Sequence, residues 1–193
     1  FERNLPRLAD HLPAEVKNMR GIPQLPGHYG LDPLEHTIEA LKESARSQTL
    51  MERFRGQWEV CREWVRCALV YHDMGKRVNP FNARHAKLSG KMARFHLRCM
   101  GYDEREERVI ARLVETHDVL GGVKRGRLSN EEGAELLCRG MEMLVPLDVL
   151  LDMHYEVAAA DIRSIGSLRQ VSVRDEYLAM KQAIRARQER ATQ

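Results

Sequence analysis

The sequence predicts an all-α protein built as a single-domain helical bundle. Apolar residues recur at helical spacing along most of the chain, whereas no stretch alternates long enough to predict a strand. Two capping boxes mark helix starts, one at Asp32 with Glu35 and one at Ser129 with Glu132. A chain of 193 residues with 43% hydrophobic residues can bury one sizeable core and is marginal for two.

The first 30 residues are predicted to form an N-terminal helical extension followed by a loop. Residues 1–21 have helical character but are interrupted by Pro6 and Pro13. Glycines and prolines then concentrate over residues 21–30, and this composition is typical of a loop.

The helix that follows has the clearest start in the sequence. Asp32 is a suitable N-cap, Pro33 suits the first helical position, and Glu35 stands where a capping box requires it. His36 is therefore expected in the first turns of this helix, and the apolar residues after it predict a buried face.

The middle of the chain is predicted to contain two helices separated by a short loop. The apolar run over residues 65–70 leads directly into His72 and Asp73, so this pair is expected where a buried helix ends. Residues 77–82 include a proline and predict the loop. A second helix is expected over residues 85–101, because its apolar positions stop at a glycine.

The second half of the chain continues the helical pattern. The expected segments are a helix over 103–116, a glycine-rich basic loop over 118–127, a helix over 129–144, an apolar helix over 147–165, and a last helix from about 173. His117 falls at the C-terminal end of the first of these helices, and Asp161 lies in the apolar one.

Composition limits the environment and the partners of this protein. The net charge of +3 is too small to indicate nucleic acid binding by itself. No apolar run approaches the roughly 20 residues of a membrane span, and no signal-peptide-like segment is visible, so we expect no membrane association. The cysteines form no CxxC pair, and we interpret them as reduced packing residues of a cytoplasmic protein without disulfides.

The pair His72-Asp73 is the strongest functional feature of the sequence. An imidazole and a carboxylate together suit a hard or borderline divalent ion. Residues of ligand type also occur in or at the ends of four other predicted helices: His36, His85, His117 and Asp161. Helical bundles build interior metal sites from side chains on facing helices. We therefore predict a metal site inside the bundle, with these six residues as its ligands.

The ligand set predicts the type of ion but leaves the number of ions open. Imidazoles and carboxylates without a thiolate favour manganese, iron, cobalt, nickel or zinc. If all six residues bind, two ions are held. If His85 and His117 do not bind, the other four hold one ion, and these two face the substrate as donors or proton carriers.

Four residues are candidates for catalysis or substrate binding. Asp73 can hold an ion and orient its water. Lys76 follows within one turn, and its ammonium can offset charge on a reacting phosphoryl group; a solvated lysine at a helix end is the alternative. Arg84 and Arg163 lie one and two residues from supposed ligands and can clamp phosphate, although surface charges are the alternative.

In their order along the chain, these residues resemble the HD superfamily of metal-dependent phosphohydrolases. Its pattern is a histidine, a His-Asp pair and a distal aspartate, and its binuclear members have two intervening histidines. The resemblance covers residues 22–165 and implies an HD metal-dependent phosphohydrolase domain there. An N-terminal extension over 1–21 and a C-terminal helix with a charged tail over 166–193 are expected to flank it.

Within this superfamily the chain is most similar to the HD domain of bacterial CCA-adding tRNA nucleotidyltransferases. The similar segments are the Gln24 loop leading to Glu35-His36-Thr37, residues 81–90, and Ala160-Asp161-Ile162-Arg163. The 193 residues include no nucleotidyltransferase domain with paired catalytic aspartates, so nucleotide addition is not implied. The HD module of this family hydrolyses 2′,3′-cyclic phosphates and phosphomonoesters, and related modules are found with RNA-end-repair kinases.

The expected function is therefore that of a metal-dependent phosphodiesterase and phosphatase. Its expected substrates are nucleotides or RNA ends that carry a 2′,3′-cyclic, 2′- or 3′-phosphate. Two other classes stay open: a di-iron oxygenase with the same order of ligands, and a non-catalytic helical module that binds RNA or a partner through Arg53, Arg55, Lys124, Arg125 and Arg127. Among hydrolases, a cyclic-dinucleotide or nucleoside-triphosphate substrate also stays open.

Overall fold

The computed structural model describes residues 8–24, 30–54, 56, 59–81 and 84–191. In chain order the α-helices are α1 (Leu8–His11), α2 (Ala14–Lys17), α3 (Pro33–Arg46), α4 (Gln48–Arg53), α5 (Val60–Tyr71), α6 (His85–Cys99), α7 (Glu104–Glu115), α8 (Val119–Lys124), α9 (Asn130–Cys138), α10 (Leu147–Ser164) and α11 (Arg174–Ala191), and the 3₁₀ helices are η4 (Met74–Arg77) and η5 (Gly166–Leu168). No strand occurs among these residues, which confirms the predicted all-α bundle.

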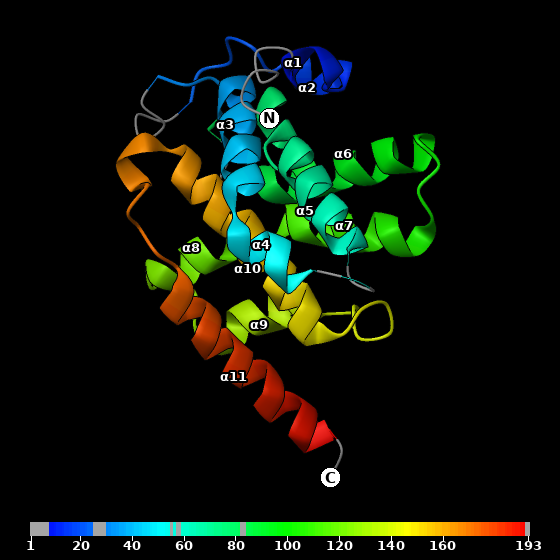
Figure 1. Ribbon diagram of the computed structural model, residues 1–193, viewed down its shortest axis with the longest axis vertical. Coiled ribbons are helices and arrows are strands. Elements are labelled where there is room, and N and C mark those ends of the chain that lie inside the picture. Colours follow the sequence, from blue (N-terminus) through cyan, green and yellow to red (C-terminus); the bar gives the residue numbers. More distant parts are fainter. Residues whose placement is uncertain (1–7, 25–29, 55, 57–58, 82–83, 192–193) are drawn as a thin grey trace.

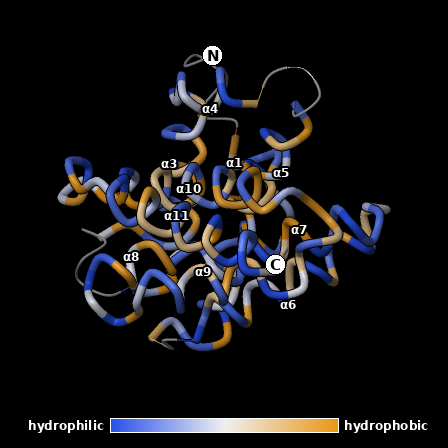
Figure 2. The backbone as a smooth tube through the Cα atoms, turned by 90° about the horizontal axis from the view of Figure 1, so that it is seen from below, coloured by the Kyte–Doolittle hydropathy of each residue, from blue (hydrophilic) through white to orange (hydrophobic). Residues whose placement is uncertain are grey.

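The helices enclose one continuous apolar core. Helix α10 packs against α3 and α5, α5 packs against α7, and α6 lies along α7 (Figure 1). Hydrophobic and hydrophilic residues are interspersed along the helices, as amphipathic helices require (Figure 2). Helix α11 packs on α9 and α10 and extends away from the end of the bundle that carries α1 and α2 (Figure 1).

The predicted helix starts are present with the expected hydrogen bonds. Asp32 Oδ1 accepts a hydrogen bond from the Glu35 amide at 2.9 Å, and the Asp32 amide donates to Glu35 Oε2 at 3.0 Å. Ser129 and Glu132 form the second capping box at the start of α9. These caps satisfy amides that have no partner within the helix, so each start is fixed by its own sequence.

Two predicted segments differ from the structure. The helix expected over 129–144 ends at Cys138, and Gly140 follows with a φ of 71°, which a helix cannot continue. The sequence analysis assigned residues 118–127 to a glycine-rich loop, but residues 119–124 form α8. Val119 and Leu120 are buried in the core, and packing outweighs the low helix propensity of the two glycines. The prediction was wrong because the glycines were read as loop signals, whereas both are buried within the helix.

The N-terminal segment joins the same core. Residues 8–21 contain α1 and α2 as two short helices, and Leu12, Val16 and Met19 are buried. The domain boundaries expected from the sequence stay a prediction. None of the described helices has the length and apolar character needed to cross a membrane. The cysteines at 61, 67, 99 and 138 are all free thiols.

A glycine allows η4 to lie directly against α6. The Gly75 amide donates a hydrogen bond to Ser89 Oγ at 2.8 Å. A Cβ atom added at Gly75 would lie 2.3 Å from the His85 carbonyl oxygen and 3.0 Å from the Ser89 amide nitrogen, so no side chain fits there. This contact fixes the turn that follows His72 and Asp73 relative to the start of α6.

Gly75→Ala is expected to destabilise the protein, because the new methyl group collides with backbone atoms rather than with a flexible side chain. Overpacking of this kind costs about 1–3 kcal/mol, which corresponds to a fall in Tm of roughly 2–12 °C. Thermal unfolding followed by circular dichroism measures it. The control is Gly166→Ala, whose added Cβ meets no atom within 4 Å. Equal melting temperatures for the two variants would contradict the proposed close approach.

Candidate metal centre

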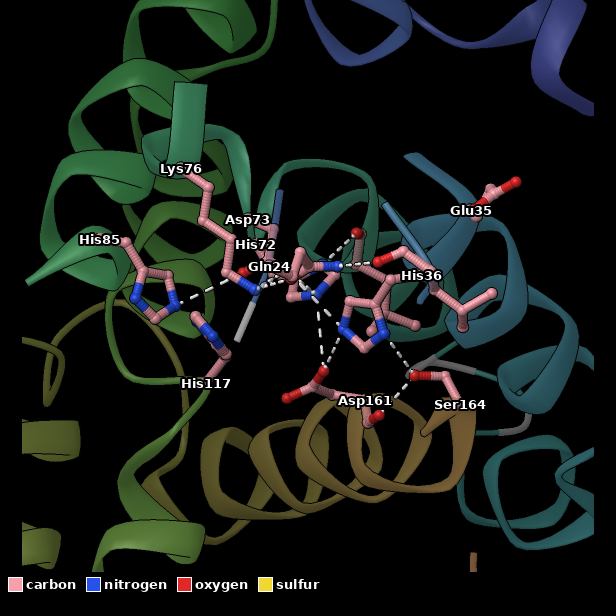
Figure 3. Close-up of polar contacts among 12 residues, drawn as sticks. Gln24, Glu35, His36, His72, Asp73, Lys76, His85, His117, Asp161 and Ser164 are labelled. Carbon is pink, nitrogen blue, oxygen red and sulfur yellow. Dashed lines mark hydrogen bonds and ion pairs between the residues drawn. The ribbon is translucent and has the colours of Figure 1, made fainter. Parts of the chain in front are cut away.

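The side chains predicted as metal ligands come from different elements and converge in the interior. Helix α3 carries His36, the end of α5 carries His72, the residue before η4 is Asp73, α6 begins with His85, His117 follows α7, and α10 carries Asp161 (Figure 3). One group consists of His36, His72 and Asp161, and the other of Asp73, His85 and His117. In each group one potential ligand atom per residue lies within 4.8 Å of the others.

The Asp73 carboxylate connects the two groups. Its Oδ2 atom lies 3.4 Å from His72 Nε2 and 3.7 Å from His36 Nε2. Its Oδ1 atom lies 3.4 Å from His85 Nε2, in the second group. With 1% of its side chain exposed, this carboxylate has almost no contact with solvent. Asp73 therefore offers one oxygen to each group of imidazoles.

Carbonyl groups at two helix ends orient two of the imidazoles. His72 Nδ1 lies 2.7 Å from the Leu69 carbonyl oxygen, and His117 Nδ1 lies 2.8 Å from the Val114 carbonyl oxygen. The last carbonyls of a helix have no intrahelical partner, so they accept the ring N–H of a histidine three residues later. When Nδ1 carries the proton, the lone pair of Nε2 is available to a metal.

Ser164 fixes the ring of His36 in a similar way. The Ser164 hydroxyl donates its proton to the Asp161 carbonyl oxygen at 2.5 Å, which leaves its oxygen to accept from His36 Nδ1 at 2.9 Å. His36 Nε2 then faces Asp161 Oδ1 at 2.7 Å. Two acceptors at this distance repel each other unless a proton or a cation lies between them.

The charges of the centre are strongly coupled. Burial alone would lower the pKa of His72, but the carboxylates of Asp73 and Asp161 outweigh it and raise that pKa to about 9. Burial alone would raise the pKa of both carboxyl groups, but the surrounding imidazoles, and Lys76 beside Asp73, hold each well below its usual range. The carboxylates are thus ionised and require positive charge around them.

The donor atoms fit a bound divalent ion. Atoms that bind one ion at about 2.0–2.2 Å stand roughly 3–3.5 Å apart, and the distances from His72 Nε2 to Asp73 Oδ2 and Asp161 Oδ1 are 3.4 and 3.5 Å. His72 Nε2 is buried and has no hydrogen-bond partner among the described residues. Buried polar atoms are normally paired, so an unpaired nitrogen between two carboxylates fits a cation bound at this position.

Lys76 lies inside the site rather than on the surface. Its ammonium donates hydrogen bonds to Asp73 Oδ2 at 2.6 Å and to Gln24 Oε1 at 2.5 Å, and 6% of the residue is exposed. Gln24 Nε2 donates to the Leu31 carbonyl oxygen at 3.2 Å, which turns the amide oxygen towards the lysine. The loop before α3 therefore holds Lys76 against the Asp73 carboxylate.

The other predicted contacts are placed less centrally. Arg84 is exposed and immediately precedes α6, and Arg163 is half-buried on α10. Neither is among the residues that line the cavity at the site, so their contact with substrate stays a prediction. Ser164 and Asp118 were not singled out in the sequence, although Ser164 follows Asp161 by one helical turn and Asp118 follows His117 directly.

A cavity of about 530 Å³ opens onto both groups of ligands. Its polar lining comprises Gln24, His36, Asp73, Lys76, His85, His117, Asp118, Arg125, Arg127 and Asp161. Its apolar lining comprises Pro80, Phe81, Ile162, Ile165 and Leu168, and Gly121 also lines it. Pockets of roughly 300–1,000 Å³ are the usual size of small-molecule sites. The arrangement thus combines a candidate metal centre with space for a ligand.

Comparison with known proteins assigns no family: no protein-family model matches the chain, and no curated protein matches it.

The purified protein is expected to bind two divalent transition ions per chain, one at each group of ligands. Asp161→Asn should remove the ion of the first group, because a neutral amide is a poorer ligand. Ser164→Ala should weaken binding there by about 10–100-fold, because the ring of His36 loses its partner. Elemental analysis and titration with manganese, nickel, cobalt and zinc measure both effects.

The control for this experiment is His11→Ala, because His11 is exposed on α1 and remote in sequence from both groups. A stoichiometry of one that survives His117→Ala would restrict binding to the first group. Metal content that is equal in Asp161→Asn and His11→Ala would contradict a metal centre at this position.

Proposed function

We propose that this protein is a metal-dependent phosphohydrolase that acts on nucleotides or RNA ends bearing a 2′,3′-cyclic, 2′- or 3′-phosphate. The observation that carries the proposal is the position of Asp73. This buried carboxylate faces imidazoles on both sides and the Lys76 ammonium, and it lines the cavity. The proposal agrees with the resemblance of the sequence to HD phosphohydrolases.

The charge of the cavity favours an anionic substrate. Three carboxylates line it, those of Asp73, Asp118 and Asp161, and the cations of Lys76, Arg125 and Arg127 balance them. A divalent ion bound by the imidazoles and carboxylates would make the cavity positive. In such a site the ion supplies Lewis acidity and a water of lowered pKa, the two requirements of phosphate ester hydrolysis at neutral pH.

The residues of the chain divide the remaining tasks. Asp73 accepts the hydrogen bond from Lys76 Nζ, so the ammonium is held beside the place where a phosphoryl oxygen must lie. The ring of His85 is more exposed than that of His72, at 19% against 0%, so it faces the cavity. It is suited to hold or donate a proton near the leaving group.

The apolar wall of the cavity favours a substrate with a flat organic part. Phe81 is 60% exposed although it lines the cavity, and Ile162, Ile165 and Leu168 belong to the same wall. Nucleobases stack on aromatic side chains with about 1–3 kcal/mol per base. An exposed phenylalanine at the cavity therefore supports a nucleotide over a small phosphate ester.

Hydrolysis of 2′,3′-cyclic AMP, 2′-AMP and a short RNA with a cyclic end is expected in the presence of manganese, nickel or cobalt. Asp73→Asn should abolish turnover, because both groups of ligands lose the carboxylate between them. Asp148→Asn is the control, since Asp148 is an exposed carboxylate of α10. Turnover of only a nucleoside triphosphate or a cyclic dinucleotide would refute the assigned substrate, and oxygen consumption by the iron form would refute hydrolysis.

Lys76→Met is expected to lower kcat/KM by about tenfold to a thousandfold, or roughly 1.4–4 kcal/mol, because the reacting phosphoryl group loses a positive charge. Metal stoichiometry should not change. The metal-free variant should also be less stable by about 1.5–3 kcal/mol, since the buried Asp73 carboxylate loses the ammonium that donates a hydrogen bond to it. Steady-state kinetics and chemical denaturation test the two effects, and wild-type kinetics in the variant would exclude a catalytic role.

A further inference from the structure

Two arginines at the cavity contribute positive charge but have no contact assigned to them so far. Arg125 and Arg127 line the cavity from the segment between α8 and α9. No hydrogen bond or ion pair joins either guanidinium group to another described residue. Several other exposed arginines of the described chain are paired, as Arg187 is with Glu135 and Arg169 with Glu43. Both guanidinium groups are therefore available to a ligand.

The two guanidinium groups lie over adjacent glycines of α8. A Cβ atom added at Gly121 would lie 3.1 Å from Arg125 Nη2, and one added at Gly122 would lie 3.8 Å from Arg127 Nη2. Both side chains thus lie over α8, where the glycines leave room for them. Burial and the charge of Arg127 lower the pKa of Arg125, so the two cations repel each other.

The neighbouring lysine provides a contrast. Lys124 precedes the pair directly, but its ammonium forms an ion pair with Glu176 at 3.3 Å and does not line the cavity. The three basic residues of this segment are therefore not equivalent. Only the two arginines combine a position at the cavity with an unpaired, repulsive charge, and an anion between them would relieve the repulsion.

The cavity also places the arginine pair close to the candidate metal centre. The charges of Asp118 and Asp161 both act on Arg125, and Asp161 belongs to the first group of ligands. A guanidinium group can bind a phosphate through two parallel hydrogen bonds, which an ammonium group cannot form. A phosphate bound by the pair would thus be a second one, beside the phosphate that lies at the metal-binding groups and Lys76.

We propose that Arg125 and Arg127 form a binding site for a second phosphate group, so that the substrate is a nucleotide with a phosphate on the 5′ side of its terminal nucleoside. This inference rests on the proposed function for the identity of the reacting phosphate. The second phosphate is the 5′-phosphate of a mononucleotide or the preceding backbone phosphate of an RNA end. The two sources share the same chemistry.

The kinetic test compares 2′,3′-cyclic AMP with its 5′-phosphorylated form and with a dinucleotide that ends in a 2′,3′-cyclic phosphate. For the wild type, kcat/KM is expected to be about 10–100-fold higher for the substrates with the additional phosphate. Arg125→Gln/Arg127→Gln should reduce this ratio to near one, and Arg125→Lys/Arg127→Lys should retain part of it. A higher ratio for the dinucleotide than for the mononucleotide assigns the source as an RNA end.

Lys124→Gln is the matched control, because it removes one positive charge from the same segment without reaching the cavity. It should keep the wild-type ratio. A wild-type ratio near one would overturn the second-phosphate site. So would a ratio that falls equally in Lys124→Gln and in Arg125→Gln/Arg127→Gln.

A binding measurement separates this inference from the proposed function. Calorimetric titration of the protein in chelator with 5′-AMP and with adenosine needs neither metal nor turnover. The wild type is expected to bind 5′-AMP about tenfold more tightly than adenosine. Arg125→Gln/Arg127→Gln should bind 5′-AMP and adenosine with equal affinity. Arginine-dependent binding without hydrolysis of any substrate upholds the site and overturns the proposed function. Hydrolysis with no arginine dependence of either binding or kinetics overturns the site alone.

Discussion

The burial of the Asp73 carboxylate is the constraint on which the rest of the site depends. A carboxylate with 1% of its side chain exposed is stable only when hydrogen bonds and positive charge replace water. The bundle meets this demand from several directions, with Lys76 and the imidazoles of His36, His72 and His85. The elements that carry these side chains therefore cannot shift without leaving a buried charge unpaired.

Contacts at helix ends orient the imidazole rings of the site. Two histidines stand just beyond the carbonyls that hold them, at the ends of α5 and α7, so the backbone that stops each helix also orients its imidazole. Ser164 does the same for His36 from the last residue of α10. The orientation of His72 and His117 thus comes from helix termination, a local property, whereas the orientation of His36 and the convergence of the ligands come from packing.

This division explains what the sequence could predict. The fold class and both capping boxes could be predicted, because caps and apolar periodicity are local signals. The six converging residues could be predicted because the His72-Asp73 pair suggested a metal site that the other four could complete. The helix α8 was missed, since burial of Val119 and Leu120 is a tertiary effect. The orientation of Lys76 towards Gln24, the role of Ser164 and the difference between Lys124 and Arg125 also depend on contacts that no periodicity encodes.

The sequence separation within the site has a consequence for how the protein is made. His36 and Asp161, which hydrogen-bond directly, are 125 residues apart. A ribosome releases the chain from its N-terminus at about 5–20 residues per second, so several seconds pass between the emergence of these two side chains. During this interval the nascent chain has the histidines of α3 and α5 but neither Asp161 nor Ser164. The complete set of six candidate ligands is therefore assembled only when α10 docks, whereas Asp73, His85 and His117 are all present earlier.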